Sequence, residues 1–108
     1  MKSKLIEEGG VTDNSLYNAE VLVKDLGIPD SVALTYIDEP WDYLCTAVWG
    51  ETSFVFSGFS WGYFGEGPKG LATFIASIDT SKDVGEFIKT IGNLDKELTD
   101  FTVFERKR

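Results

Sequence analysis

Apolar residues recur every three or four positions in three stretches of the chain, the spacing of one face of an α-helix. The stretches span residues 13–26, 68–78 and 84–91. Asp13 can cap the first stretch, and Gly27 followed by Pro29 is typical of its end. Pro68 suits the first position of the second. The pattern therefore predicts three helices.

Alternating apolar and polar residues predict four strands. They cover residues 31–37, 43–49, 52–57 and 100–105. Gly50 favours a two-residue hairpin between the second and third strands, which pairs Trp49 with Thr52. This register places one set of apolar side chains on one face: Tyr43, Cys45, Ala47, Trp49, Phe54 and Phe56.

The aromatic alternation changes parity after this hairpin. Phe54 and Phe56 occupy even positions, whereas Phe59, Trp61 and Tyr63 occupy odd ones. A bulge or bend at Gly58 would keep all five rings on one face. We therefore expect the extended chain to continue to Tyr63.

The predicted order is α-β-β-β-α-α-β. Clustered strands and clustered helices indicate an α+β fold, with a mainly antiparallel sheet of about four strands and helices packed on one face. A chain of 108 residues is expected to form a single domain, 1–108. The exposed edge of such a sheet makes a homodimer a reasonable expectation.

The charge distribution restricts the partners. The chain has 18 acidic and 10 basic residues, a net charge of −8, and no Lys or Arg between Lys24 and Lys69. Such a field disfavours direct binding to nucleic acid or to an anionic membrane and favours a basic partner. The common alternative is an acidic surface that only keeps a protein soluble. The first ten residues carry charges and no apolar run, so we expect a cytoplasmic protein without a secretory signal.

Residue types argue against catalysis. The chain has no histidine, which excludes histidine-based triads and histidine metal sites. Its one cysteine, Cys45, alternates with apolar neighbours and is expected to be a buried structural thiol. We predict a non-enzymatic protein with no metal and no cofactor.

A glycine-rich segment follows the aromatic stretch, and Gly65, Gly67 and Gly70 match G-x-G-x-x-G by letter. A dinucleotide-binding fold needs repeated βαβ units, which this short chain with hairpin-linked strands lacks. The segment can still hold an anion, because a helix that begins at Gly67 presents the N–H groups of Lys69 and Gly70.

Neighbouring side chains extend this candidate ligand site. Lys69 adds a positive charge, and Trp61, Tyr63 and Phe64 could stack on a base, so the predicted ligand is a nucleotide. In the alternative interpretation the glycines only make a tight turn, Glu66 stabilises the helix start, and the aromatic residues belong to the core.

A second candidate is the acidic loop between the first two predicted strands. Asp38, Glu39 and Asp42 surround Trp41, which would anchor a protein partner if it is exposed. The carboxylates could instead bind a hard cation, work as an acid–base pair, or form a solvated loop.

Residues 59–72 read F-S-W-G-Y-F-G-E-G-P-K-G-L-A. This stretch resembles the core of a small uncharacterised family of bacteria and their phages, which carries F-x-W-G-Y-G-G-S-G-P-x-x-L-A. Phe64 and Glu66 replace a glycine and the serine of that pattern, which makes the loop bulkier and more negative. The resemblance implies no known activity, but it implies a phage or mobile-element origin, the host-cell cytoplasm and an anti-defence role.

Two functions follow as hypotheses. The first is a phage-type anti-defence protein that binds or sequesters a nucleotide signal at the glycine-rich loop. The second is an acidic inhibitor that docks on a basic, nucleic-acid-binding host protein. A small structural or assembly subunit is a third possibility.

Overall fold

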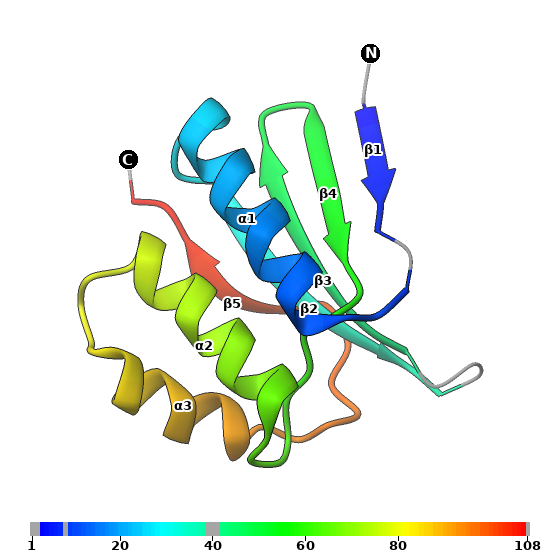
Figure 1. Cartoon of the computed structure of the whole chain (residues 1–108), viewed down its shortest axis with the longest axis vertical. Coiled ribbons are helices and arrows are strands. Elements are labelled where there is room, and N and C mark those ends of the chain that lie inside the picture. Colours follow the sequence, from blue (N-terminus) through cyan, green and yellow to red (C-terminus); the bar gives the residue numbers. More distant parts are fainter. Residues whose placement is uncertain (1–2, 8, 39–41, 108) are drawn as a thin grey trace.

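A computed structural model of the chain describes residues 3–7, 9–38 and 42–107 (Figure 1). These residues form an α+β fold of three helices and one five-stranded sheet. The elements in order are β1 (Ser3–Ile6), α1 (Thr12–Leu26), β2 (Ser31–Ile37), β3 (Asp42–Trp49), β4 (Thr52–Phe56), α2 (Glu66–Ile78), α3 (Val84–Gly92) and β5 (Phe101–Glu105).

The sheet has the strand order β1-β4-β3-β2-β5. β2, β3, β4 and β5 pair antiparallel as predicted, but β1 adds a fifth strand that pairs parallel with β4. The prediction of about four antiparallel strands therefore misses β1. β1 has only two apolar residues, Leu5 and Ile6. They are adjacent and form no alternating pattern that would indicate a strand.

The predicted β3–β4 hairpin is confirmed in register. Trp49 pairs with Thr52, and Cys45 pairs with Phe56. Gly50 has a φ of 59°, which a residue without Cβ adopts at little cost. The predicted apolar face lies against the helices: Cys45, Ala47 and Phe56 are fully buried, and Tyr43, Trp49 and Phe54 pack around them.

The three helices lie together on one face of the sheet (Figure 1). Ala19 of α1, Ile75 of α2 and Ile91 of α3 meet the inward side chains of the strands in one core cluster. Three aromatic rings pack together within it: Phe59 stacks on Phe74 with centroids 5.7 Å apart, and Phe56 is tilted against Phe59 with centroids 5.3 Å apart. The arrangement of helices over one sheet face agrees with the prediction.

Two helix starts differ from prediction. Asp13 does not cap α1, because Val11 occupies the cap position without a side-chain hydrogen bond. Asp13 lies instead in the first turn, where its carboxylate faces the positive end of the helix dipole. α2 begins earlier than predicted, with Gly65 as its cap and Pro68 in its third position. Proline is tolerated there because that N–H has no partner within the helix.

The strand predicted beyond Gly58 is not formed. β4 ends at Phe56, and residues 57–65 run as an irregular connection to α2. Gly58 turns the chain toward α1: its N–H donates to Ser15 Oγ at 2.9 Å, and a Cβ there would lie 2.4 Å from the Val11 carbonyl oxygen. Phe59 and Trp61 still reach the core, but Tyr63 does not.

Within the described ranges, none of the helices has the length and apolar character needed to cross a membrane.

Candidate functional site

The glycine-rich segment forms the first turn of α2. The Lys69 N–H donates to the Gly65 carbonyl at 3.1 Å, so it is part of the helix and does not point at a ligand. Pro68 has no N–H, which leaves the amides of Glu66 and Gly67 without an acceptor inside the helix. The free amides of the first turn are therefore those of Glu66 and Gly67, three residues before the predicted Lys69 and Gly70.

Two of the glycines are required by packing. A Cβ on Gly67 would lie 2.0 Å from Ser60 Oγ, and a Cβ on Gly70 would lie 2.4 Å from Thr12 Cγ2. Both glycines are buried where α2 passes the connection from β4 and the start of α1. Ser60 and Thr12 fill the space beside these two glycines. This favours the interpretation that the glycines serve the turn and its packing.

The predicted stacking residues separate into two groups. Trp61 is fully buried, its Nε1–H donates to the Lys96 carbonyl at 3.1 Å, and its ring meets Tyr43 edge-on at 4.9 Å. It offers no face to a ligand. Tyr63 and Phe64 are 46% and 64% exposed and could contact one. Lys69 is exposed as well.

A small hollow lies between the first turns of α1 and α2. Its volume is about 210 Å³. Five hydroxyl side chains from separate segments of the chain line it, together with Gly67: Thr12, Tyr43, Ser57, Ser60 and Tyr63. Pockets for whole small molecules measure roughly 300–1,000 Å³, so this hollow has room for a phosphate-sized group only.

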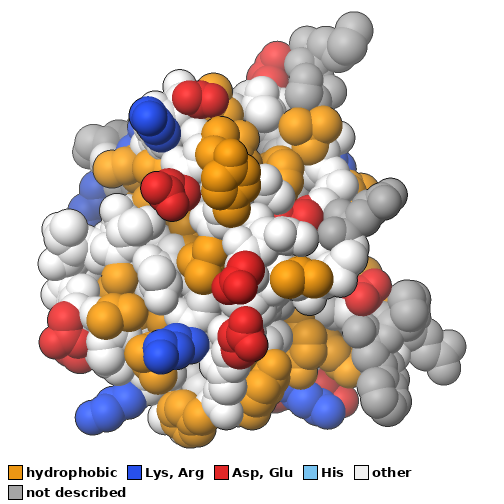
Figure 2. Space-filling model, in the orientation of Figure 1, with side chains coloured by type: hydrophobic (Ala, Val, Ile, Leu, Met, Phe, Trp, Pro, Cys, Tyr) orange, Lys and Arg blue, Asp and Glu red, His pale blue; other side chains and the backbone are white. Residues whose placement is uncertain are grey.

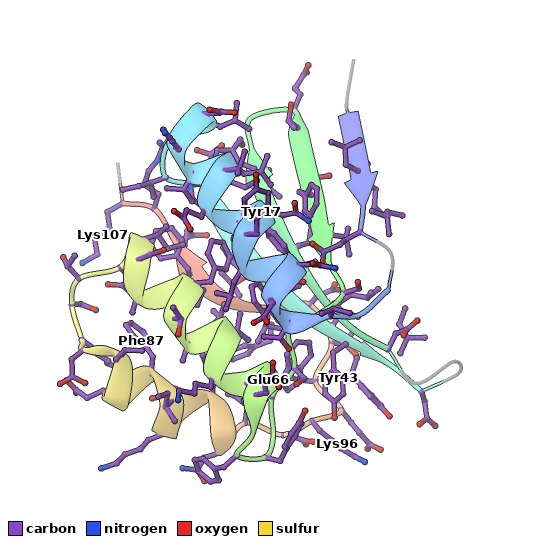
Figure 3. The ribbon with its side chains drawn as sticks, viewed as in Figure 1. Tyr17, Tyr43, Glu66, Phe87, Lys96 and Lys107 are labelled. Carbon is purple, nitrogen blue, oxygen red and sulfur yellow. The ribbon has the colours of Figure 1, made fainter. Side chains whose placement is uncertain are left out.

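The hydroxyl groups in this hollow are already oriented. Ser60 Oγ and Tyr63 Oη are 2.7 Å apart, and Thr12 Oγ1 donates to the Gly58 carbonyl at 2.7 Å. Burial, with smaller contributions from Tyr63 and Tyr36, raises the pKa of Tyr43, whose hydroxyl is therefore protonated well beyond neutral pH. Tyr43, Glu66 and Lys96 are labelled on this flank of the molecule in Figure 3.

A polar cluster beside the hollow joins β1 to the rest of the fold. The Glu7 carboxylate accepts from the Ser57 N–H at 3.0 Å, from Asn18 Nδ2 at 2.6 Å and from Ser15 Oγ. Ser15 and Asn18 belong to α1, and Ser57 directly follows β4. This cluster is not predicted from the sequence, since nothing near Glu7 indicates which distant donors its carboxylate will meet.

The second candidate site lies on a projecting pair of strands. β2 and β3 pair as far as Ile37 and Asp42, whereas β4 pairs with β3 only to Cys45 and β5 pairs with β2 only to Leu34. We call residues 35–38 and 42–44 the hairpin arm. In Figure 1 these ends of β2 and β3 extend beyond the neighbouring strands.

The hairpin arm is braced at its base and exposed at its end. The Tyr36 N–H donates to the Leu98 carbonyl at 2.9 Å, and the Tyr36 and Tyr43 rings lie 5.0 Å apart. Ile37, Asp38 and Asp42 are exposed. Glu39 and Trp41, the other predicted partner-binding residues, lie outside the described residues. The described carboxylates are thus displayed on a supported projection.

Cys45 lies in the middle of β3 and is fully buried in the core. Burial and, secondarily, the charge of Glu7 raise the pKa of its thiol. Across residues 3–7, 9–38 and 42–107, no three side chains suited to metal ligation come together.

No family model, curated protein or solved structure matches the chain. The similarity of residues 59–72 to a bacterial and phage family therefore stays a prediction.

Proposed function

We propose that the protein is a non-enzymatic binding protein that docks on a basic protein surface through its hairpin arm. The observation that carries this proposal is a supported projection that ends in exposed Asp38 and Asp42 beside exposed Ile37. Glu39 and Trp41 follow in the sequence between them. A nucleic-acid-binding host protein is the kind of basic partner that the proposed phage origin would supply.

The arm combines the two interactions that a docking element needs. Carboxylates on an acidic protein attract a basic surface over about a Debye length and raise the association rate. An apolar side chain at the same point supplies the short-range contact that lowers the dissociation rate. The glycines at the start of α2 also favour a protein partner over a small ligand. Side chains packed against Gly67 and Gly70 occupy the space that the predicted anion site would need.

The test compares two variants that lose the same charge. Asp38→Asn with Asp42→Asn removes both described arm carboxylates, and Asp13→Asn with Glu20→Gln removes two exposed carboxylates of α1. Tagged wild type and both double variants are exposed to a bacterial lysate at low salt, and captured proteins are identified. We expect the arm variant alone to lose a basic partner whose capture weakens steeply with salt. Equal loss in both variants, or no capture by wild type, would contradict arm docking.

A nucleotide-type ligand is the second candidate, favoured by the hydroxyl-lined hollow. Ser60, Tyr63 and Thr12 could hold a phosphate-sized group there, while the exposed ring of Phe64 or Tyr63 stacks on a base. This function would suit a protein that sequesters a nucleotide signal.

Calorimetry with mono-, di- and cyclic nucleotides tests the second candidate. We expect heat of binding for wild type and a weaker signal for Tyr63→Phe, which keeps the ring and removes one hydroxyl. Val84→Ala, which alters an exposed residue of α3, serves as the control. No heat with any nucleotide at millimolar concentration would exclude this function.

A further inference from the structure

The sheet has a second face that no helix covers among the described residues. Val32 and Leu34 of β2 point toward the helices, so their neighbours Ser31, Ala33 and Thr35 point away. The pairing register extends this alternation across all strands. The side chains of this open face are Lys4 and Ile6 of β1, Ser53 and Val55 of β4, Asp42, Leu44, Thr46 and Val48 of β3, Ser31, Ala33, Thr35 and Ile37 of β2, and Thr102 and Glu105 of β5.

The open face is uncharged across its centre. By register, Ile6, Val55, Thr46, Ala33 and Thr102 form one row across the five strands. All five are apolar or hydroxyl side chains. Ile6, Thr46, Ala33 and Thr102 are at least partly exposed, whereas Val55 is already covered. By contrast, Figure 2 shows acidic and basic side chains scattered over the helix-covered face.

The neighbouring row carries one charge at each end. It runs Lys4, Ser53, Val48, Ser31, Glu105, from the β1 edge of the sheet to the β5 edge. Both charged side chains are exposed. Opposite charges therefore stand at equal height on opposite edges of the open face.

We propose that the open face is a contact surface between two copies of this chain. A two-fold axis parallel to β3 exchanges the β1 and β5 edges, so Lys4 of one copy meets Glu105 of the other, and the same pair forms a second time. Between these pairs the uncharged rows pack face to face, as sheets do in a sandwich. Across the two rows that span all five strands, two molecules of net charge −8 can approach without bringing like charges together. At the end of β3, however, Asp42 of one copy faces Asp42 of the other, and this repulsion weakens the dimer at low salt.

The size of the face predicts a reversible dimer. With about 4.8 Å between strands and about 6.8 Å between alternate residues, two rows across five strands and two across the hairpin arm cover roughly 450 Å² per copy. The pair then buries roughly 900 Å² of flat area, near the lower end of specific interfaces at about 1,000–1,200 Å². Its population should therefore depend on protein concentration in the micromolar range and above.

Sedimentation analysis of the whole 108-residue chain from micromolar to millimolar concentration tests the proposal. We expect wild type to shift from monomer to dimer, and Thr46→Lys to remain monomeric because it places like charges at the centre of the contact. Thr73→Lys adds the same charge to the exposed side of α2 and should dimerise like wild type. Monomeric wild type at every concentration overturns the proposal, as does a dimer that tolerates Thr46→Lys, which would indicate pairing through a sheet edge.

Charge exchange tests the alignment with variants at exposed edge positions, which leave the interior unchanged. Lys4→Glu and Glu105→Lys should each weaken dimerisation at least several-fold, and the double variant, which restores the net charge, should recover it. Lys24→Glu on α1 controls for the charge change of Lys4→Glu. A double variant no better than the singles overturns the two-fold arrangement.

Discussion

Position 67 is a glycine because its surroundings leave no space for a Cβ atom. Ser60 Oγ stands 2.0 Å from where its Cβ would be, and Ser60 is itself held by a 2.7 Å hydrogen bond with Tyr63. Rotating the Ser60 hydroxyl away would break this hydrogen bond and would still leave Ser60 Cβ 3.2 Å from the added Cβ. The residue identity at position 67 is thus set by the path of the chain between β4 and α2.

Gly67→Ala should lower the free energy of unfolding by about 1–3 kcal/mol through overpacking. Helix propensity alone would raise it by up to about 1 kcal/mol, so the sign of the change identifies the dominant effect. Urea unfolding gives the value, and adding Ser60→Ala should recover part of the loss. A Gly67→Ala protein as stable as wild type would mean that packing does not explain this glycine.

The buried thiol of Cys45 makes stability depend on pH in the alkaline range. Its pKa is raised in the folded protein, so above about pH 8.5 the unfolded chain releases a proton that the folded chain retains. The free energy of unfolding therefore falls as pH rises, by at most about 1.4 kcal/mol per pH unit.

Cys45→Ala should remove this slope between about pH 8.5 and 10, below the range in which tyrosines of the unfolded chain titrate. Urea unfolding of wild type and variant at several pH values measures both slopes. Parallel slopes would show that the thiol titrates alike in the folded and unfolded states.

At the scale of elements, Glu7 determines how β1 is held. One carboxylate accepts hydrogen bonds from α1 and from the chain after β4, so it connects three segments. β1 itself contributes only four residues of pairing at the sheet edge. We infer that its attachment depends on this carboxylate as much as on the strand.

Glu7→Ala should lower the free energy of unfolding by about 1–3 kcal/mol, because it leaves part-buried donors without an acceptor. Hydrogen exchange should also accelerate at the Ser57 amide, which donates to Glu7. Glu20→Ala removes an exposed carboxylate of α1 and should change neither quantity much. Unchanged exchange at Ser57 in Glu7→Ala would contradict this role.

The elements that the sequence predicts correctly are those with long internal patterns. α1, α3 and the β3–β4 hairpin carry periodic apolar residues and clear turn residues, which act within a few positions of each other. β1 carries no such pattern, and its pairing with β4 depends on residues far along the chain. The strand expected to reach Tyr63 fails for a similar reason, since contact with α1 bends the chain at Gly58.

The candidate sites also differ in how far the local sequence predicts them. The exposed carboxylates Asp38 and Asp42 follow from local composition, and so does the glycine turn before α2. The hollow does not, because Thr12, Tyr43 and Ser60 come together only through tertiary packing. Burial of Trp61 also depends on the core as a whole, which a local aromatic pattern does not reveal.

For the whole molecule, stability should be graded across the sheet. β3 lies at the centre with partners on both sides, whereas β1 is an edge strand with one short partner. Native-state hydrogen exchange should therefore show the β3 amides opening only with global unfolding and the β1 amides opening at a clearly lower free energy. Equal protection of β1 and β3 would show that the sheet opens as one unit.

The parallel pairing of β1 has a consequence for synthesis of the chain. Ser3 leaves the ribosome roughly fifty residues before Thr52, the residue it pairs with. At ~5–20 residues per second, Leu5 and Ile6 remain without their strand partner for several seconds, during which α1, β2 and β3 have already been made. β1 is short and carries the charged side chain of Lys4. Both features limit how readily β1 pairs with another nascent chain in that interval.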